Sequence, residues 1–268
     1  MKTGVKINLG LHILGRREDG FHELETIFVP SDWYRDDLTI SLREAQDLQN
    51  NRPVALEDGT TVEIFPCDWD PKQDLTLKAY KLLKEEFKLP PVNIRLHKQV
   101  PVGAGLGGGS ADAAASLIML NQMFDLALSQ DELAERAARL GSDCAFFIYG
   151  GARLGRGRGE LLSPIDIALD DYEIRIGIPD GESVSTAEAY KGIWDVVKER
   201  YPNGREPLSE LIKLPIEMWQ DRICNDFELT ILPHHPRIAA LKQQMLDQGA
   251  IYASMTGSGA AVYGLFKK

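Results

Sequence analysis

PVGAGLGGGSADAAA, the stretch from Pro101 to Ala115, decides how the rest of the sequence is interpreted. Residues 103–109 contain five glycines, and the composition then changes abruptly to Ser-Ala-Asp-Ala-Ala-Ala. Because glycine lacks a Cβ and tolerates positive φ, successive N–H groups of such a loop can point at one ligand. Ser110 and Asp112 favour a helix start, and residues 113–120 are strong helix formers. A loop that enters a helix N-terminus favours a bound anion, so the stretch predicts a phosphate site.

Three other interpretations of the stretch are open. Its G-x-G-x-x-G spacing at residues 103–108 matches the dinucleotide fingerprint, but Pro101 interrupts the approach and residues 117–128 look helical where a second strand is needed. A Walker A loop ends in Gly-Lys-Ser/Thr, whereas this chain has Gly109-Ser110. A flexible turn is the third interpretation, and the strong helix signal that follows disfavours it.

The stretch also resembles the phosphate loop of the GHMP small-molecule kinases, whose pattern is Pro-x-x-x-Gly-Leu-Gly-Ser/Gly-Ser. Residues 5–9 (VKINL) and 15–24 (GRREDGFHEL) are similar to the opening of one family within that superfamily, the 4-diphosphocytidyl-2-C-methyl-D-erythritol kinases. These are ATP-dependent enzymes of the non-mevalonate (MEP) route to isoprenoids. The resemblance implies an α+β, two-domain GHMP kinase fold, with a ribosomal-S5-like N-terminal domain, a ferredoxin-like C-terminal domain and the site in the cleft between them. We expect these domains at residues 1–155 and 156–268.

For the nucleotide, the resemblance implies that the glycine loop and the helix start hold the ATP phosphates. The residues concerned are Pro101, Val102, Gly103, Ala104, Gly105, Leu106, Gly107, Gly108, Gly109, Ser110 and Ala111. Lys98 lies near the end of a strand expected at residues 92–100, where the resemblance places backbone contacts to adenine. Mg²⁺ is expected with ATP, and Ser110 is the candidate for a protein ligand to it.

Two residues are candidates for catalysis. Lys6 and Asn8 share the polar face of a strand expected at residues 5–14, which by itself could be a solvated face. The resemblance makes Lys6 catalytic and places Asn8 in the substrate pocket. Asp143 follows Gly141-Ser142, where an aspartate is often a helix cap, and the resemblance assigns it as the catalytic acid-base residue.

Four further residues are implied to bind the cytidine end of the substrate: Phe21, His22, Thr186 and Tyr190. Phe21 and Tyr190 would sandwich the cytosine ring. The family usually has tyrosine at the Phe21 position, but stacking requires only the π face, which phenylalanine retains. Without the resemblance, His22 could be an ordinary surface histidine.

The predicted reaction is phosphorylation of the 2-hydroxyl of 4-diphosphocytidyl-2-C-methyl-D-erythritol. Asp143 would accept the hydroxyl proton, and Lys6 would keep Asp143 ionised or assist the γ-phosphate. The alternatives are another GHMP small-molecule alcohol kinase, or a catalytically idle nucleotide-binding regulatory protein. The presence of both Lys6 and Asp143 disfavours an idle protein.

The bulk composition limits the other classes of function. The chain has 268 residues, of which 44% are hydrophobic and 26% charged, values typical of a globular protein. A net charge of −10 argues against nucleic-acid and acidic-membrane partners. Cys67, Cys144 and Cys224 have no metal-type spacing and are expected to be reduced thiols. No signal peptide or apolar run of spanning length is present, so we expect a cytoplasmic protein. We also expect it to be a monomer or a weak homodimer.

The remaining pattern predicts an irregular order of strands and helices. Besides those above, strands are expected at residues 23–30, 33–42, 60–65, 172–178 and 260–266, and helices at 74–89, 129–140 and 236–248. Residues 43–59 look polar and irregular, and residues 58–59 are expected to close a hairpin. A second hairpin is expected at residues 152–160. Residues 146–149 are expected to form a short helix or a strand. We expect residues 225–228 (NDFE) to have a capping and packing role. Residues 254–259 (SMTGSG) are expected to form a second glycine loop.

Overall fold

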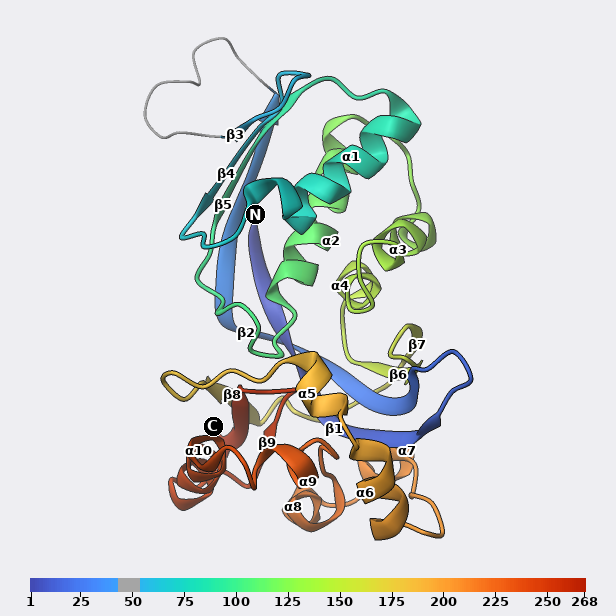
Figure 1. Ribbon diagram of the computed structural model, residues 1–268, viewed down its shortest axis with the longest axis vertical. Coiled ribbons are helices and arrows are strands. Elements are labelled where there is room, and N and C mark those ends of the chain that lie inside the picture. Colours follow the sequence, from blue (N-terminus) through green and yellow to red (C-terminus); the bar gives the residue numbers. More distant parts are fainter. Residues whose placement is uncertain (43–53) are drawn as a thin grey trace. The chain divides into compact units, whose positions relative to one another are not determined.

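A computed structural model describes residues 1–42 and 54–268, and it has the mixed helices and strands of an α+β protein (Figure 1). Its contacts divide the chain into two compact units that interleave along the sequence. The first contains Met1–Val5, Tyr34–Val102 and Gly107–Gly150, and the second Lys6–Trp33, Gly103–Leu106 and Gly151–Lys268. The expected division at residue 155 assumes domains that are contiguous in sequence, and it stays a prediction.

The first unit combines a sheet with a group of helices (Figure 1). Its strand order is β3 (Val54–Ala55), β4 (Thr61–Phe65), β5 (Val92–His97) and then residues 37–42 of β2 (His22–Leu42). The β3–β4 hairpin confirms the turn predicted at residues 58–59, whereas residues 43–53 of that predicted irregular segment lie outside the described residues. The helical elements are η1 (Pro71–Gln73), α1 (Leu75–Phe87), α2 (Gly108–Met123), α3 (Gln130–Ala138) and α4 (Cys144–Tyr149).

Local sequence signals fix most of these helix ends. The carboxylate of Asp74 accepts the N–H of Thr76 (2.9 Å) and begins α1. Ser129 and Glu132 form a reciprocal capping box at α3, as the sequence predicts. Residues 144–149 form the short helix α4, so the strand alternative for that segment is wrong.

The second unit contains a three-stranded antiparallel sheet in the order β8 (Tyr172–Gly177), β10 (Val262–Lys267), β9 (Tyr252–Met255). Residues 24–28 of β2 pair with β6 (Arg153–Gly157), and β6 pairs with β7 (Leu161–Pro164) in the predicted hairpin. The helical elements are α5 (Thr186–Tyr190), α6 (Ile193–Arg200), α7 (Leu208–Leu211), η2 (Ile216–Met218), α8 (Trp219–Arg222), α9 (Glu228–Ile231) and α10 (Pro236–Asp247).

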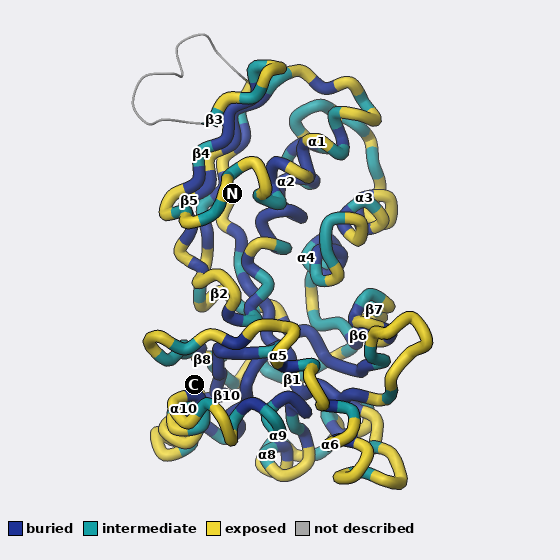
Figure 2. The backbone as a smooth tube through the Cα atoms, viewed as in Figure 1, coloured by how far each residue is buried: buried dark blue, intermediate teal, exposed yellow. Residues whose placement is uncertain are grey.

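Two strands differ from the prediction. β1 (Lys2–Arg16) is buried on both faces over most of its length (Figure 2), so the solvated-face interpretation of Lys6 and Asn8 is wrong. The two strands predicted at residues 23–30 and 33–42 are the single strand β2. Its Pro30 lies outside the stretches that pair with β6 and with β5, so the missing N–H leaves those two ladders intact; β2 also pairs with β1.

Candidate active site

The phosphate loop enters α2 directly through Gly107. Gly107 is the N-cap in the left-handed conformation (φ 72°, ψ 17°), and no side chain caps the helix. The prediction that Ser110 or Asp112 begins the helix is therefore wrong, because the left-handed glycine already turns the chain at residue 108. The first-turn N–H groups of α2 receive no side-chain cap, which is the arrangement that suits a phosphate group.

Buried ion pairs anchor the chain on both sides of this loop. The Lys98 ammonium donates to Asp36 and to Asp112 (2.8 Å), and Thr3 donates to the other oxygen of Asp112 (2.5 Å). The second oxygen of Asp36 accepts the N–H groups of residues 99 and 100 (2.5 and 2.7 Å). Burial lowers the pKa of the Lys98 amine, but Asp112 and Asp36 together outweigh it and hold that pKa above its ordinary value.

These ion pairs give Lys98 a structural role within the first unit, which its position in the sequence does not reveal. Its side chain is 7% exposed and ties the end of β5 to the second turn of α2. Its backbone N–H donates to the carbonyl of Phe65 (2.7 Å), so an adenine contact at Lys98 would use the carbonyl oxygen. The adenine contact stays a prediction. Sequence analysis missed Asp36, which lies in the middle of a strand without any motif around it.

A cavity of about 460 Å³ lies beside the first half of the loop. It is lined by Pro66, Cys67, Asp68, Trp69, Lys98, Gln99, Val100, Pro101 and Val102, all of the first unit. Sequence analysis assigned no site residue to 66–69. The indole of Trp69 and the thiol of Cys67 are both half-buried there.

In the second unit, Lys6 lies against the phosphate loop. Its ammonium donates to the carbonyl of Gly105 (2.8 Å) and to Oδ1 of Asn8 (2.7 Å), and its N–H donates to the carbonyl of Leu106 (2.9 Å). The Asn8 amide also donates to Thr26 (2.9 Å), and Asn8 is only 2% exposed. Asn8 therefore holds Lys6 in place, and its contact with substrate stays a prediction.

Asp143 directly precedes α4 in the first unit. Its side chain makes no capping hydrogen bond to that helix, so the structure does not support the helix-cap interpretation. Ser142 donates weakly to it (3.4 Å). Ser110 hydrogen-bonds the neighbouring Cys144, whose pKa burial raises to about 11, so the start of α2 and the segment around Asp143 are adjacent within this unit.

The predicted cytidine-binding residues lie in the second unit. The rings of His22 and Tyr190 stack with centroids 5.0 Å apart, and Tyr190 also meets the edge of Phe227 (4.8 Å). Burial and then the charge of Arg16 hold the pKa of His22 below its ordinary value. Thr186 is exposed at the first position of α5.

Phe21 is 53% exposed, and the Arg158 guanidinium covers its ring at 4.8 Å. The structure thus brings His22 and Tyr190 together, while the partner of the Phe21 ring is Arg158. Sequence analysis missed Arg158 because it considered residues 152–160 only as a hairpin. The sandwich of cytosine by Phe21 and Tyr190 stays a prediction.

Comparison with known proteins identifies the family. Residues 74–151 match the GHMP kinases N terminal domain, and residues 208–268 match the GHMP kinases C terminal domain. A 4-diphosphocytidyl-2-C-methyl-D-erythritol kinase of Azobacteroides pseudotrichonymphae is 42% identical over 263 residues, which cover 98% of this chain and 91% of the relative. One of Bacteroides fragilis strain ATCC 25285 is 43% identical over 97% of this chain and 89% of its own length. The chain belongs to the 4-diphosphocytidyl-2-C-methyl-D-erythritol kinase family.

Solved structures agree with the GHMP kinase fold. A crystal structure of 4-(cytidine 5'-diphospho)-2C-methyl-D-erythritol kinase is 28% identical with a TM-score of 0.77, and the match covers 99% of this chain and 90% of that one. The Methanococcus jannaschii mevalonate kinase, at 13% identity and a TM-score of 0.69 over 100% and 90% of the two chains, shares the fold. The expectation of a two-domain GHMP kinase fold is confirmed.

Within residues 1–42 and 54–268, no helix has the length and hydrophobicity needed to span a bilayer. The same residues contain no group of three or more His, Cys, Asp or Glu side chains that could hold a metal ion.

Proposed function

We propose that this chain transfers the γ-phosphoryl group of ATP to the 2-hydroxyl of 4-diphosphocytidyl-2-C-methyl-D-erythritol, in the MEP route to isoprenoid precursors. The observation that carries the proposal is the phosphate loop: α2 begins without a side-chain cap, and the Lys6 ammonium is held at the carbonyl of Gly105. The names of relatives more than 40% identical to the chain supply the substrate.

ATP would bind along the glycine loop. The cavity beside residues 98–102 is the candidate for adenine, with the half-buried Trp69 in its wall. The β- and γ-phosphates would lie on the N–H groups of residues 107–110 at the start of α2, since the N–H of Ala111 already donates to the carbonyl of Gly107. We propose that the loop residues predicted from the sequence to bind the cofactor, 101–111, lie along this path.

The residues present fit Mg²⁺ as the companion of ATP. Mg²⁺ prefers oxygen ligands and usually takes only one or two from the protein, the rest coming from phosphates and water. The Ser110 hydroxyl, in the first turn of α2, is the candidate ligand. When bound, the ion neutralises charge on the β- and γ-phosphate oxygens.

In the reaction, the carboxylate of Asp143 accepts the proton of the 2-hydroxyl as that oxygen forms its bond to the γ-phosphorus. The bond between the γ-phosphorus and the bridging oxygen breaks, and ADP leaves with the bonding electrons. Lys6 offsets the charge that develops on the transferred group. Hydrogen bonds to Asn8 and to the carbonyl of Gly105 hold the ammonium in position before substrate arrives.

The cytidine end would bind remote from the transferred phosphoryl group. His22 and Tyr190 supply a stacked pair, and Phe21 with Arg158 supplies a second aromatic surface beside a cation. Binding energy gained there can orient the hydroxyl for transfer. We also propose that the enzyme acts in the cytoplasm as a monomer or weak homodimer, in keeping with its three free thiols at Cys67, Cys144 and Cys224.

The test is a coupled ADP-release assay on a panel of alcohols: 4-diphosphocytidyl-2-C-methyl-D-erythritol, mevalonate and homoserine. We expect turnover with the cytidine substrate alone. Turnover with another alcohol would favour a different GHMP kinase, and ATP binding without any turnover would favour the idle nucleotide-binding protein.

The same assay tests the base. We expect Asp143→Asn to lower kcat by roughly 10²- to 10⁴-fold, because an amide cannot accept the hydroxyl proton, while ATP affinity measured by calorimetry stays unchanged. Asp74→Asn is the matched control, since asparagine also caps a helix and Asp74 begins α1. Wild-type turnover in Asp143→Asn would remove Asp143 from the mechanism.

A further inference from the structure

The second glycine loop, residues 254–259, begins with the last two residues of β9 and continues into the turn before β10, where it lies in backbone contact with the phosphate loop. A Cβ on Gly105 would lie 2.4 Å from the carbonyl oxygen of Thr256, so no side chain fits between the two loops. A Cβ on Gly257 would lie 3.0 Å from the Gly105 carbonyl oxygen and 3.4 Å from the Lys6 nitrogen. The N–H of Ala261 also donates to the carbonyl of Ala104 (3.2 Å). The second loop thus backs the carbonyl that receives the Lys6 ammonium.

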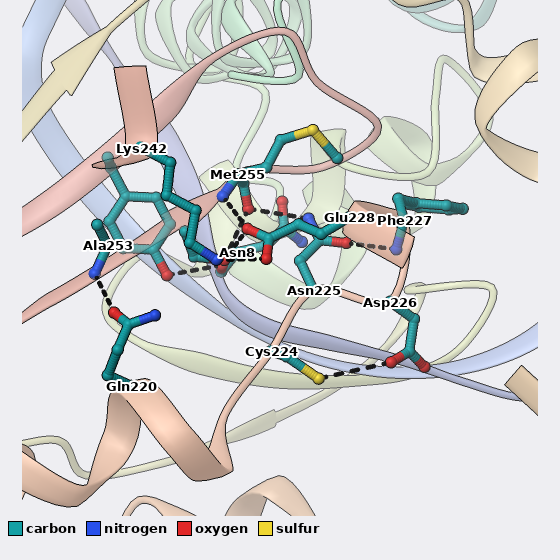
Figure 3. Close-up of polar contacts among 12 residues, drawn as sticks. Asn8, Gln220, Cys224, Asn225, Asp226, Phe227, Glu228, Lys242, Ala253 and Met255 are labelled. Atoms are coloured by element: carbon teal, nitrogen blue, oxygen red, sulfur yellow. Dashed lines mark hydrogen bonds and ion pairs between the residues drawn. The ribbon is translucent and has the colours of Figure 1, made fainter. Parts of the chain in front are cut away.

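Asn225 holds this second loop from behind. Its side-chain amide donates to the carbonyls of Met255 (2.9 Å) and Gly257 (2.8 Å), and its Oδ1 accepts the N–H of Phe227 (3.1 Å). Figure 3 shows the Asn225 side chain within this cluster of polar contacts, close to Met255 and Phe227. With 1% exposure, the amide has no water to replace these partners.

The surroundings of Asn225 are themselves fixed. The carbonyl of Cys224 accepts the N–H of Leu11, and the N–H of Asp226 donates to the carbonyl of Leu11 (2.9 and 2.8 Å), which ties the segment to β1. On the other side, Glu228 accepts the N–H of Met255 (2.7 Å) and the ammonium of Lys242 (2.5 Å), as Figure 3 shows. Asn225 is therefore a rigid support with both donors aimed at the loop.

We propose that Asn225 is a positioning residue for phosphoryl transfer. Its amide donates to the carbonyls of Met255 and Gly257. The second glycine loop packs against Gly105, and the carbonyl of Gly105 accepts from the ammonium of Lys6. The proposal goes beyond the capping and packing role that the sequence predicts for residues 225–228, and it rests on the proposed kinase function only for its assay.

Asn225→Asp is the decisive variant. Aspartate has the size of asparagine and still accepts from Phe227, but its carboxylate cannot donate to the two carbonyls and repels them. Since a misplacement of about 1 Å can cost about 10²-fold in rate, we expect kcat to fall roughly 10- to 100-fold. We expect KM for the cytidine substrate to stay within about two-fold, because the stacking groups at His22 and Tyr190 are unchanged.

A pH series distinguishes positioning from a general loss of structure. The introduced carboxyl is buried and faces two carbonyl oxygens, with the carboxylate of Glu228 in the same cluster of polar contacts, and these surroundings raise its pKa against the ammonium groups of Lys6 and Lys242. Once protonated it donates one hydrogen bond, so the ratio of variant to wild-type kcat should rise from pH 8 to pH 6. Asn225→Ala cannot donate at any pH, and its ratio should stay flat.

Gln220→Glu is the matched control. It makes the same amide-to-carboxylate change in the cluster of polar contacts that Figure 3 shows. The Gln220 side chain accepts the N–H of Ala253 (2.8 Å), and a carboxylate accepts equally well. Its kcat should equal that of the wild type. Unchanged kcat in a folded Asn225→Asp, or a kcat ratio that does not respond to pH, would overturn the positioning role. Failure of the wild type itself to turn over would instead count against the proposed function.

Discussion

His12 is a buried histidine without a hydrogen-bond partner. Its side chain is fully buried in β1, and neither ring nitrogen has a partner among the described residues. Burial, and then the charge of Arg205, lowers its pKa from 6.5 to about 3. His12 therefore stays neutral in the folded protein at a pH where the unfolded chain binds a proton.

This difference makes His12 a source of acid sensitivity. Between about pH 6.5 and 3 the unfolded state binds more protons, so the free energy of unfolding falls as pH falls. At pH 5 the loss amounts to about 2 kcal/mol, from 1.36 kcal/mol per pKa unit. We expect His12→Leu to reduce the difference in unfolding free energy between pH 7 and pH 5 by about this amount, measured in urea. An unchanged difference would show that His12 does not titrate in this way.

Single residues also show where prediction from sequence stops. Lys6 and Asp143 could be found because a family pattern surrounds each of them. The burial of Lys6 and Asn8 could not, because alternation in β1 identifies one apolar face and says nothing about what covers the other. Asp36 and Asn225 act through hydrogen bonds to segments more than 25 residues away in sequence, which local pattern does not encode.

At the scale of elements, the prediction succeeded where periodicity and caps act locally. Strands β4 and β8 and helices α1 and α3 lie within a few residues of their predicted bounds, because each has its own apolar pattern and turn or capping residues. The prediction of elements failed where the effect of a glycine or a proline on the backbone depends on its surroundings. Pro30 predicts a break within β2, and Ser110 predicts a helix start that Gly107 already provides.

The start of α2 gives a prediction for the loop. Gly107→Val forces a β-branched residue into the left-handed region, at a cost of about 1–3 kcal/mol, and turns the first N–H groups away from phosphate. We expect ATP affinity, measured by calorimetry, to fall at least about ten-fold, from roughly 1.4 kcal/mol or more of lost binding.

Gly192→Val separates strain from ligand binding. Gly192 is the left-handed N-cap of α6 with the same φ of 72°, has open space around its Cβ position and lies outside the loop. It should lose comparable stability and keep ATP affinity. Equal ATP affinity in the two variants would show that the start of α2 does not hold the phosphates.

At the scale of the whole molecule, the second unit depends on the N-terminal hairpin, which is formed by the pairing of β1 with β2. Leu11, Ile13 and Leu24 belong to the same hydrophobic cluster as Phe227 and Ile231. β1 and β2 also supply polar partners: Asp226 accepts the N–H of Ile13 (2.8 Å), and Glu25 accepts the N–H of Leu208 (2.6 Å). Such pairing of distant segments cannot be read from composition, which is why the sequence suggests contiguous domains divided at residue 155.

This interleaving predicts how the chain responds to division. A fragment of residues 156–268 keeps the β8–β10–β9 sheet but exposes Phe227 and Ile231 and leaves the carboxylate of Asp226 without its β1 donor. We expect it to show no cooperative transition in urea. Residues 6–33 joined by a flexible linker to 151–268 restore the hairpin to its cluster, and that chain should unfold cooperatively, since buried apolar contacts within a unit supply its stability. Cooperative unfolding of the 156–268 fragment alone would mean that the C-terminal domain is independent, as a division at residue 155 requires.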